Sequence, residues 1–105
     1  MNDSVSNLMY QENNVLVEIG FDSRIIKVIC ESNDNIYSNY KGMGMEEFFP
    51  EDALISVLKL CVDSIVLGKC QYGRCEVEEK SSKMIDIKAM STDKGILLFL
   101  NSTSI

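Results

Sequence analysis

The sequence predicts an α+β domain in which helices pack on one face of a five-stranded antiparallel sheet. Two short runs that suit β-strands come early in the chain, and three more come at its end. Between the two groups lies an apolar-rich segment, residues 51–67, with acidic residues in its first turn and a glycine directly after it, which is typical of a long α-helix. A length of 105 residues corresponds to one domain.

Composition and charge exclude several classes of function. The formal net charge is −6, so the chain lacks the basic stripe that nucleic-acid binding requires and is repelled by an anionic membrane surface. No apolar run approaches the roughly 20 residues that a membrane-spanning helix needs. The polar N-terminus lacks the basic region of a secretory signal. We expect a cytoplasmic protein with no membrane insertion and no nucleic-acid partner.

Residues 15–19 and 25–30 are predicted to pair as a β-hairpin. Both runs are rich in valine and isoleucine, which favour strands. Residues 20–24 between them contain glycine, aspartate and serine, which favour a turn.

The first 14 residues are expected to form an N-terminal arm or a short helix ahead of the domain, which then spans residues 15–105. They are mostly polar, and their apolar residues Val5, Leu8 and Met9 fall at helical spacing.

Three helical segments are expected in the middle of the chain: a short helix opened by residues 32–34, one turn at residues 46–49 that Pro50 ends, and the main helix at residues 51–67. The polar residues of the main helix form one narrow stripe, made by Asp52, Ser56, Lys59 and Asp63. A helix exposed on one side carries a wider polar face. We therefore expect the main helix to pack on more than one side.

The last three strands are predicted at residues 70–79, 83–90 and 96–100. The first two alternate apolar and polar residues, as half-buried strands do. The third is apolar on both faces, which indicates a central strand or one that is covered on both sides.

Two motifs extend this description. Residues 20–26 read Gly-Phe-Asp-Ser-Arg-Ile-Ile, and residues 48–52 read Phe-Phe-Pro-Glu-Asp. In their order and spacing, these motifs resemble the turn between the first two strands and the start of the long helix in PAS domains, the sensory and dimerisation modules of signalling proteins. The resemblance covers about residues 15–104. The chain departs from the family pattern at Gly20 and Ser23, and residues 101–103 keep only the threonine of the usual terminal Asp-Ile-Thr.

The resemblance implies a sheet with strand order 2-1-5-4-3 and a regulatory function. Such a module binds a small ligand or a partner and transmits a conformational change through residues 101–105 to an output domain outside this chain. The chain is then a fragment of a larger signalling protein or a stand-alone module. One alternative is a ligand-free platform for protein interaction or dimerisation. A small enzyme ranks lowest, because the chain has no histidine to act as the usual general base.

Any ligand pocket is expected to be apolar and to lie between the sheet and residues 32–58. Its candidate lining combines inward strand positions with the helix faces that should meet them: Val17, Val28, Ile36, Tyr37, Phe48, Leu54, Leu58, Ile87 and Leu98. The methionines of the chain suit an adaptable pocket or an ordinary core, and the core is favoured.

No cofactor or metal is expected. Haem needs an axial ligand that is usually histidine, which the chain lacks. Photoactive flavin domains carry a cysteine in an Asn-Cys-Arg-Phe-like run, and neither Cys30 nor Cys75 has that context. No cysteine near the N-terminus suits bilin attachment. The four cysteines are expected to stay reduced.

A homodimer is expected from the apolar outer face of the last strand. A sheet covered by helices on one side would leave Leu97 or Phe99 in an exposed patch on the other. The N-terminal segment and a second copy of the chain are the two candidates to cover it. The expected interface residues are Val5, Leu8, Met9, Leu97 and Phe99.

Overall fold

The computed structural model describes residue 8 and residues 12–30, 40–78 and 83–104. Along these residues the chain forms five strands and two helices, in the order β1 (Asn14–Gly20), β2 (Ile25–Cys30), α2 (Met45–Phe48), α3 (Glu51–Leu67), β3 (Gln71–Glu78), β4 (Lys83–Ser91) and β5 (Gly95–Ser104). The helix expected after residues 32–34 and most of the N-terminal arm lie outside the described residues.

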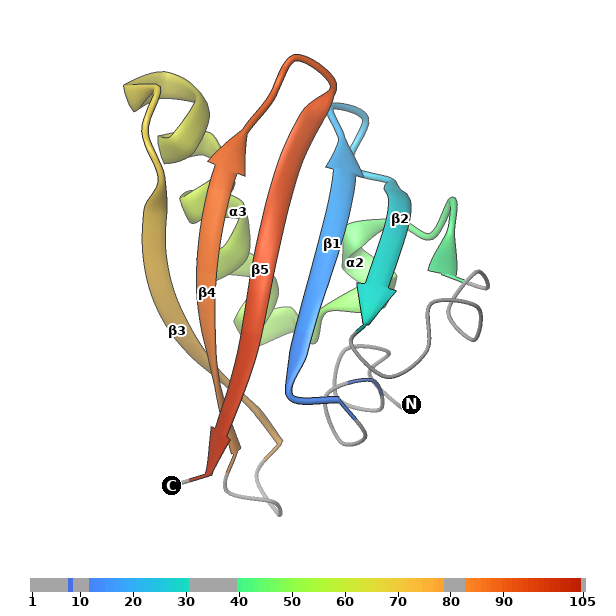
Figure 1. Cartoon of the computed structure of the whole chain (residues 1–105), viewed down its shortest axis with the longest axis vertical. Helices are drawn as coiled ribbons and strands as arrows, with labels where there is room; N and C mark the ends of the chain where they lie inside the picture. Colours follow the sequence, from blue (N-terminus) through green and yellow to red (C-terminus); the bar gives the residue numbers. More distant parts are fainter. Residues whose placement is uncertain (1–7, 9–11, 31–39, 79–82, 105) are drawn as a thin grey trace.

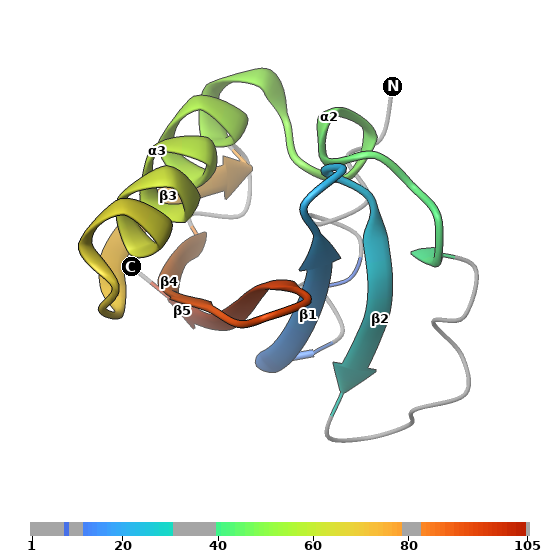
Figure 2. The same cartoon turned by 90° about the horizontal axis from the view of Figure 1, so that it is seen from above.

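The strands form one antiparallel sheet with the order β2-β1-β5-β4-β3 (Figure 1). The α+β class and the strand order predicted from the sequence are therefore confirmed. β5 is the central strand, as its apolar sequence indicated; its inward side chains are buried, while Leu97 and Phe99 on its outward face stay partly exposed. Both α2 and α3 lie on the same side of the sheet (Figure 2), and α3 packs against β3 and β4.

The hairpin between β1 and β2 is closed by the turn chemistry that the sequence indicated. Asp22 Oδ1 accepts a hydrogen bond from the backbone N–H of Arg24 at 3.1 Å, and Ser23 takes a positive φ of 67°. The Arg24 guanidinium then donates to the carbonyl of Gly42 at 2.9 Å. The hairpin is thereby tied to the segment that leads into α2.

The core lies between the sheet and the helices. Strand side chains alternate between the two faces, and the inward ones are buried together with residues of α2 and α3. The inward strand residues are Val15, Val17, Ile19, Ile25, Val28, Cys30, Cys75, Ile85, Ile87, Ala89, Ile96, Leu98 and Leu100.

The main helix packs with one face only, so the expectation that it packs on more than one side is wrong for the described chain. Its buried face consists of Ala53, Val57, Cys61 and Ser64. The Ser64 hydroxyl donates to the Cys61 carbonyl at 2.8 Å, and the Ser64 carbonyl accepts from the Ser91 hydroxyl on β4 at 3.2 Å. The opposite side is apolar but exposed, at Ile55, Leu58, Val62, Ile65, Val66 and Leu67.

Candidate functional site

A depression of about 510 Å³ lies on the face of the sheet that the helices leave open. Figure 1 looks onto this open face, with α2 and α3 behind it. All five strands contribute to the lining, which consists of Asn14, Val15, Leu16, Ile29, Cys30, Tyr72, Gly73, Asp86, Ile87, Lys88, Phe99, Leu100 and Asn101. Of the lining side chains that point away from the core, half are apolar or aromatic and half are polar or charged.

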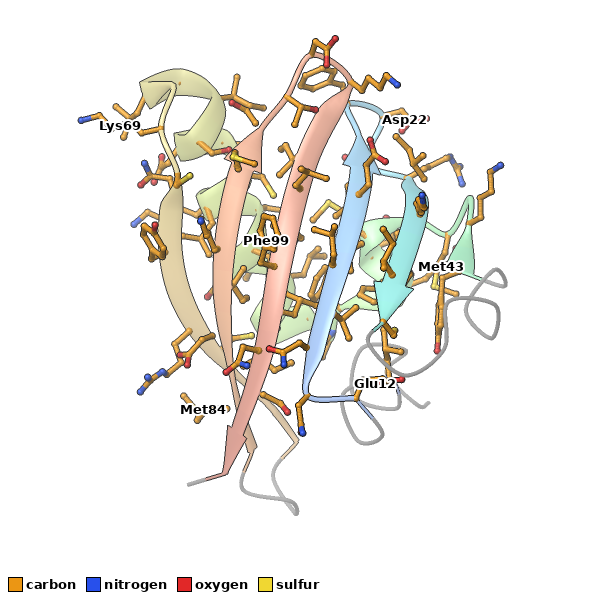
Figure 3. All side chains as sticks on the ribbon, in the orientation of Figure 1. Glu12, Asp22, Met43, Lys69, Met84 and Phe99 are labelled. Carbon is orange, nitrogen blue, oxygen red and sulfur yellow. The ribbon has the colours of Figure 1, made fainter. Side chains whose placement is uncertain are left out.

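One cross-strand row of side chains runs through the depression. Each member pairs in register with the next, so all five side chains point to the open face: Tyr72, Lys88, Phe99, Leu16 and Ile29, from β3 to β2. Phe99 stands near the middle of this face (Figure 3) and is 38% exposed. We call these five residues the central row.

Lys88 sits between the two aromatic residues of the central row. Its Nζ lies 5.5 Å from the ring centroid of Phe99 and 6.0 Å from that of Tyr72. An ammonium at this distance from a ring face is attracted by the negative potential of the π-system. The two rings therefore favour a position of the ammonium within the depression.

A polar row follows the central row on one side. It is formed by Arg74, Asp86, Asn101 and Asn14, again one residue from each of four adjacent strands. Arg74 Nε donates to Asp86 Oδ1 at 2.6 Å, and the Asn101 amide donates to Asn14 Oδ1. Both members of the Arg74–Asp86 pair are exposed, so the pair contributes little stability. It does neutralise the carboxylate nearest to Lys88 along β4.

On its other side, the central row is followed by a mixed row. In register order from β4 to β2, this mixed row consists of Met90, Leu97, Glu18 and Lys27. Met90 and Leu97 are half-buried. The open face thus carries an apolar centre with charges of both signs around it.

The residues predicted to line an internal pocket are divided by the structure. Val17, Val28, Phe48, Ile87 and Leu98 belong to the buried core cluster, and Leu54 packs against it half-buried. By contrast, Leu58 is exposed, because it lies on the side of α3 that turns away from the sheet. Ile36 and Tyr37 lie outside the described residues. An internal pocket remains a prediction.

The residues predicted for an interface are also divided. Leu97 and Phe99 do point to the open face, as expected. Leu8 is only 1% exposed and belongs to the core cluster, so it does not cover the depression. Val5 and Met9 lie outside the described residues.

Sequence reasoning did not identify Leu16, Ile29, Tyr72 or Lys88 as site residues. Alternation along residues 83–90 already placed Lys88 on a polar face of its strand. What was missing is the register between strands, which brings residues as far apart in sequence as Leu16 and Phe99 into one row.

Burial sets the chemistry of the cysteines. The Cys61 and Cys75 thiols lie in the core, and burial raises the pKa of each to about 11. The Tyr40 ring stacks edge-on against Phe48. The pKa of the Tyr40 hydroxyl is raised, mainly by burial and to a smaller extent by the nearby Cys30 thiol. The Cys61 and Cys75 thiols are therefore protonated at neutral pH, as expected of buried structural cysteines.

Comparison with protein-family models, curated proteins and solved structures found no match. Within the described part of the chain, no helix has both the length and the apolar character needed to cross a bilayer. Among the same residues, no three histidine, cysteine or acidic side chains come together in a group that could hold a metal ion.

Proposed function

We propose that this chain is a PAS-type regulatory module that acts by binding a second copy of itself through the open face of its sheet. The observation that carries the proposal is the central row with its apolar surroundings. An apolar centre crosses the face that no described helix covers, while the inward side chains beneath it are closely packed. The strand order 2-1-5-4-3, which the PAS resemblance implies, supports the family assignment.

A second copy suits this face for two physical reasons. Burying a contiguous apolar surface against a partner is favourable, because it removes that surface from water. A two-fold symmetric contact places the same patch on both sides, so each apolar centre meets its twin. Lys27, Lys88, Glu18 and Asp86 carry both signs on the same face, which allows opposite charges to meet across the contact.

Signal transfer would follow from the place of β5. This strand forms the centre of the sheet, contributes Leu97 and Phe99 to the open face and continues to Ser104. A change in how two copies pack would therefore act on the strand that leads towards residue 105, and from there on an output domain outside this chain.

A small-ligand sensor is the second candidate function. The observation that favours it is the depression itself, since about 510 Å³ lies within the range of about 300–1,000 Å³ that is usual for small-molecule sites. In this case ligand binding, and not self-association alone, would change the packing of the sheet.

Sedimentation velocity over a series of concentrations up to the high micromolar range tests self-association. We expect the unmodified chain to form a dimer, and Phe99→Glu and Leu97→Glu to be monomers with unchanged circular dichroism. Val66→Glu is the matched control, because Val66 is an exposed apolar residue on α3, away from the open face. It should remain dimeric. A monomeric unmodified chain at high micromolar concentration would refute the proposal, as would dissociation by Val66→Glu alone.

A further inference from the structure

We propose that the depression on the open face binds a small carboxylate with a flat apolar body, and that Lys88 is its anion-binding group. The site shares the open face with the proposed self-association but does not depend on it. The proposal rests on three properties of the depression: a cation without a carboxylate partner, aromatic and aliphatic walls, and the sign of the local charge.

The ammonium of Lys88 has no carboxylate partner among the described side chains. Its contacts are the rings of Tyr72 and Phe99, and the ion pair on this face joins Arg74 to Asp86 instead. Lys88 as a residue is half-buried, and its Nζ stands over two aromatic rings that exclude water from one side of it. An anion that stacks on the same rings would meet this ammonium at the edge of the apolar surface, where a charge contact is stronger than in bulk water.

The apolar and aromatic side chains of the depression determine which uncharged part of a ligand it can bind. Tyr72 and Phe99 present aromatic rings on either side of Lys88, and Leu16 and Ile29 extend the apolar floor across β1 and β2. Flat apolar groups stack well on aromatic side chains and bury apolar area on aliphatic ones. A planar ring system therefore suits this floor.

The charge of the depression determines the sign of the ligand. Lys88 contributes one positive charge, while Asp86 is compensated by the Arg74 guanidinium. The chain as a whole carries a net charge of −6, so this local positive charge is a departure from its surroundings. A cationic ligand would be repelled here, and a neutral one would leave the ammonium without a counter-charge.

The number of donors favours a carboxylate over a phosphate. Phosphate sites in proteins combine several donors, such as arginine forks, helix N-termini or successive backbone N–H groups. Among the described residues that line this depression, Lys88 contributes the one ammonium, which is a single point charge on a flexible stem. One such charge beside a large apolar floor matches a monovalent anion whose affinity comes mostly from its body.

A ligand series on the unmodified chain tests the proposal without any substitution. The probes are 2-naphthoate, neutral 2-naphthamide and cationic 2-naphthylmethylammonium, which share one ring system and differ in charge. Fluorescence anisotropy should show 2-naphthoate binding tighter than 2-naphthamide by about tenfold, which is the gain expected for a charge-assisted contact. Amide shifts in ¹⁵N NMR should concentrate at the central row. Equal affinity for the three probes, no binding of 2-naphthoate at millimolar concentration by either the unmodified chain or Leu97→Glu, or shifts confined to other parts of the chain would overturn it.

Three variants assign the charge to Lys88. Lys88→Met keeps the length and apolar stem of the side chain, and should weaken 2-naphthoate binding to the level of 2-naphthamide. Lys88→Glu should reverse the preference and select 2-naphthylmethylammonium. Lys27→Met is the matched control, because Lys27 lies on the same face but does not line the depression. It should leave the affinity unchanged. An equal loss of affinity in Lys27→Met and Lys88→Met would contradict a specific site.

The outcome is separable from that of the proposed function. Because the ligand and a second copy would occupy the same face, the titration is repeated in Leu97→Glu, whose substituted side chain lies outside the lining of the depression. A monomeric chain that binds 2-naphthoate refutes the self-association alone. If the unmodified chain is a dimer, and neither it nor Leu97→Glu binds 2-naphthoate, then the carboxylate site alone is refuted.

Discussion

Leu60 on α3 lies directly over Gly73 on β3: a Cβ added to the glycine would stand 2.7 Å from Leu60 Cδ1. The helix can approach this edge of the sheet because residue 73 has no side chain. The end of the Leu60 side chain must shift to admit a Cβ, so Gly73→Ala should lower the free energy of unfolding by up to about 1 kcal/mol, the low end of overpacking costs. Urea unfolding followed by circular dichroism measures the change.

Replacing Leu60 should reverse the sign of the stability change caused by Gly73→Ala. In a Leu60→Ala background the clash is gone, and alanine restricts the unfolded chain more than glycine does. Gly73→Ala should then stabilise by about 0.5 kcal/mol. A double-mutant cycle with no coupling between the two positions would show that Leu60 does not limit residue 73.

Gly95 should tolerate alanine far less well than Gly68. A Cβ on Gly95 would fall 2.0 Å from the carbonyl oxygen of Ile19 on the neighbouring strand, and backbone atoms cannot move aside as a side-chain end can. We expect a loss of about 3 kcal/mol or more, or failure to fold.

Gly68 provides the comparison for Gly95. It ends α3 with a left-handed φ of 66° and has open space around it, so Gly68→Ala meets only the backbone strain of that conformation. Its loss should be about 1 kcal/mol. Equal losses for the two variants in urea unfolding would mean that the contact between Gly95 and β1 is not as close as described.

Valine to alanine substitutions at two positions of α3 should separate its buried face from its exposed face. Val57 is 0% exposed and Val66 is 73% exposed. Val57→Ala removes buried methyl groups and leaves a cavity, so unfolding should become easier by about 2 kcal/mol. Val66→Ala loses little burial and gains helix propensity, so it should be neutral or stabilising by up to about 0.5 kcal/mol.

The comparison of these two variants is itself the test. A substantial loss of stability in Val66→Ala at micromolar concentration would show that another surface covers this side of α3 in solution, and would contradict the one-sided packing described above.

The buried thiols should resist modification at neutral pH. Burial raises the pKa of Cys61 and Cys75 from 9.0 to about 11, which lowers their thiolate fraction about a hundredfold near pH 8. Cys70 is half-buried and therefore more accessible. Iodoacetamide labelling followed by peptide mass spectrometry should modify Cys70 first. Modification of Cys61 or Cys75 at the same rate as Cys70 in the native protein would contradict their burial.

The same two thiols make stability depend on alkaline pH. A group whose pKa is raised on folding favours the folded state while it is protonated, so its contribution is complete below pH 9 and decreases as the pH rises towards 11. The free energy of unfolding should fall over this window. A Cys61→Ala/Cys75→Ala variant should show a smaller decrease, and an identical decrease would assign the effect to other groups.

Much of the fold follows from local sequence pattern. The turn at Asp22 and Ser23, the stop at Gly68 and the alternation in β4 depend on short-range chemistry, which a single sequence displays directly. The apolar run of β5 likewise indicated a central strand, and β5 does lie between β1 and β4 in the middle of the sheet.

The packing of α3 shows where local pattern misleads. Its narrow polar stripe indicated burial on several sides, yet Ile55 and Val66 are exposed. Hydrophobic periodicity reports which residues are apolar, and it does not report whether a neighbour is available to cover them. Only the position of α3, over β3 and β4 at one side of the sheet, decides that.

The candidate site depends on tertiary structure for a related reason. Sequence alone determined that residues such as Lys88 and Phe99 alternate with core residues along their own strands. Which residue of one strand stands beside which residue of the next is set by register, and a slip of one position would turn the opposite face of a strand towards solvent. The antiparallel register of five strands places Tyr72, Lys88 and Phe99 side by side, and brings Leu16 and Ile29 into the same row from the other end of the chain. The depression is therefore formed by long-range strand pairing and not by local propensity.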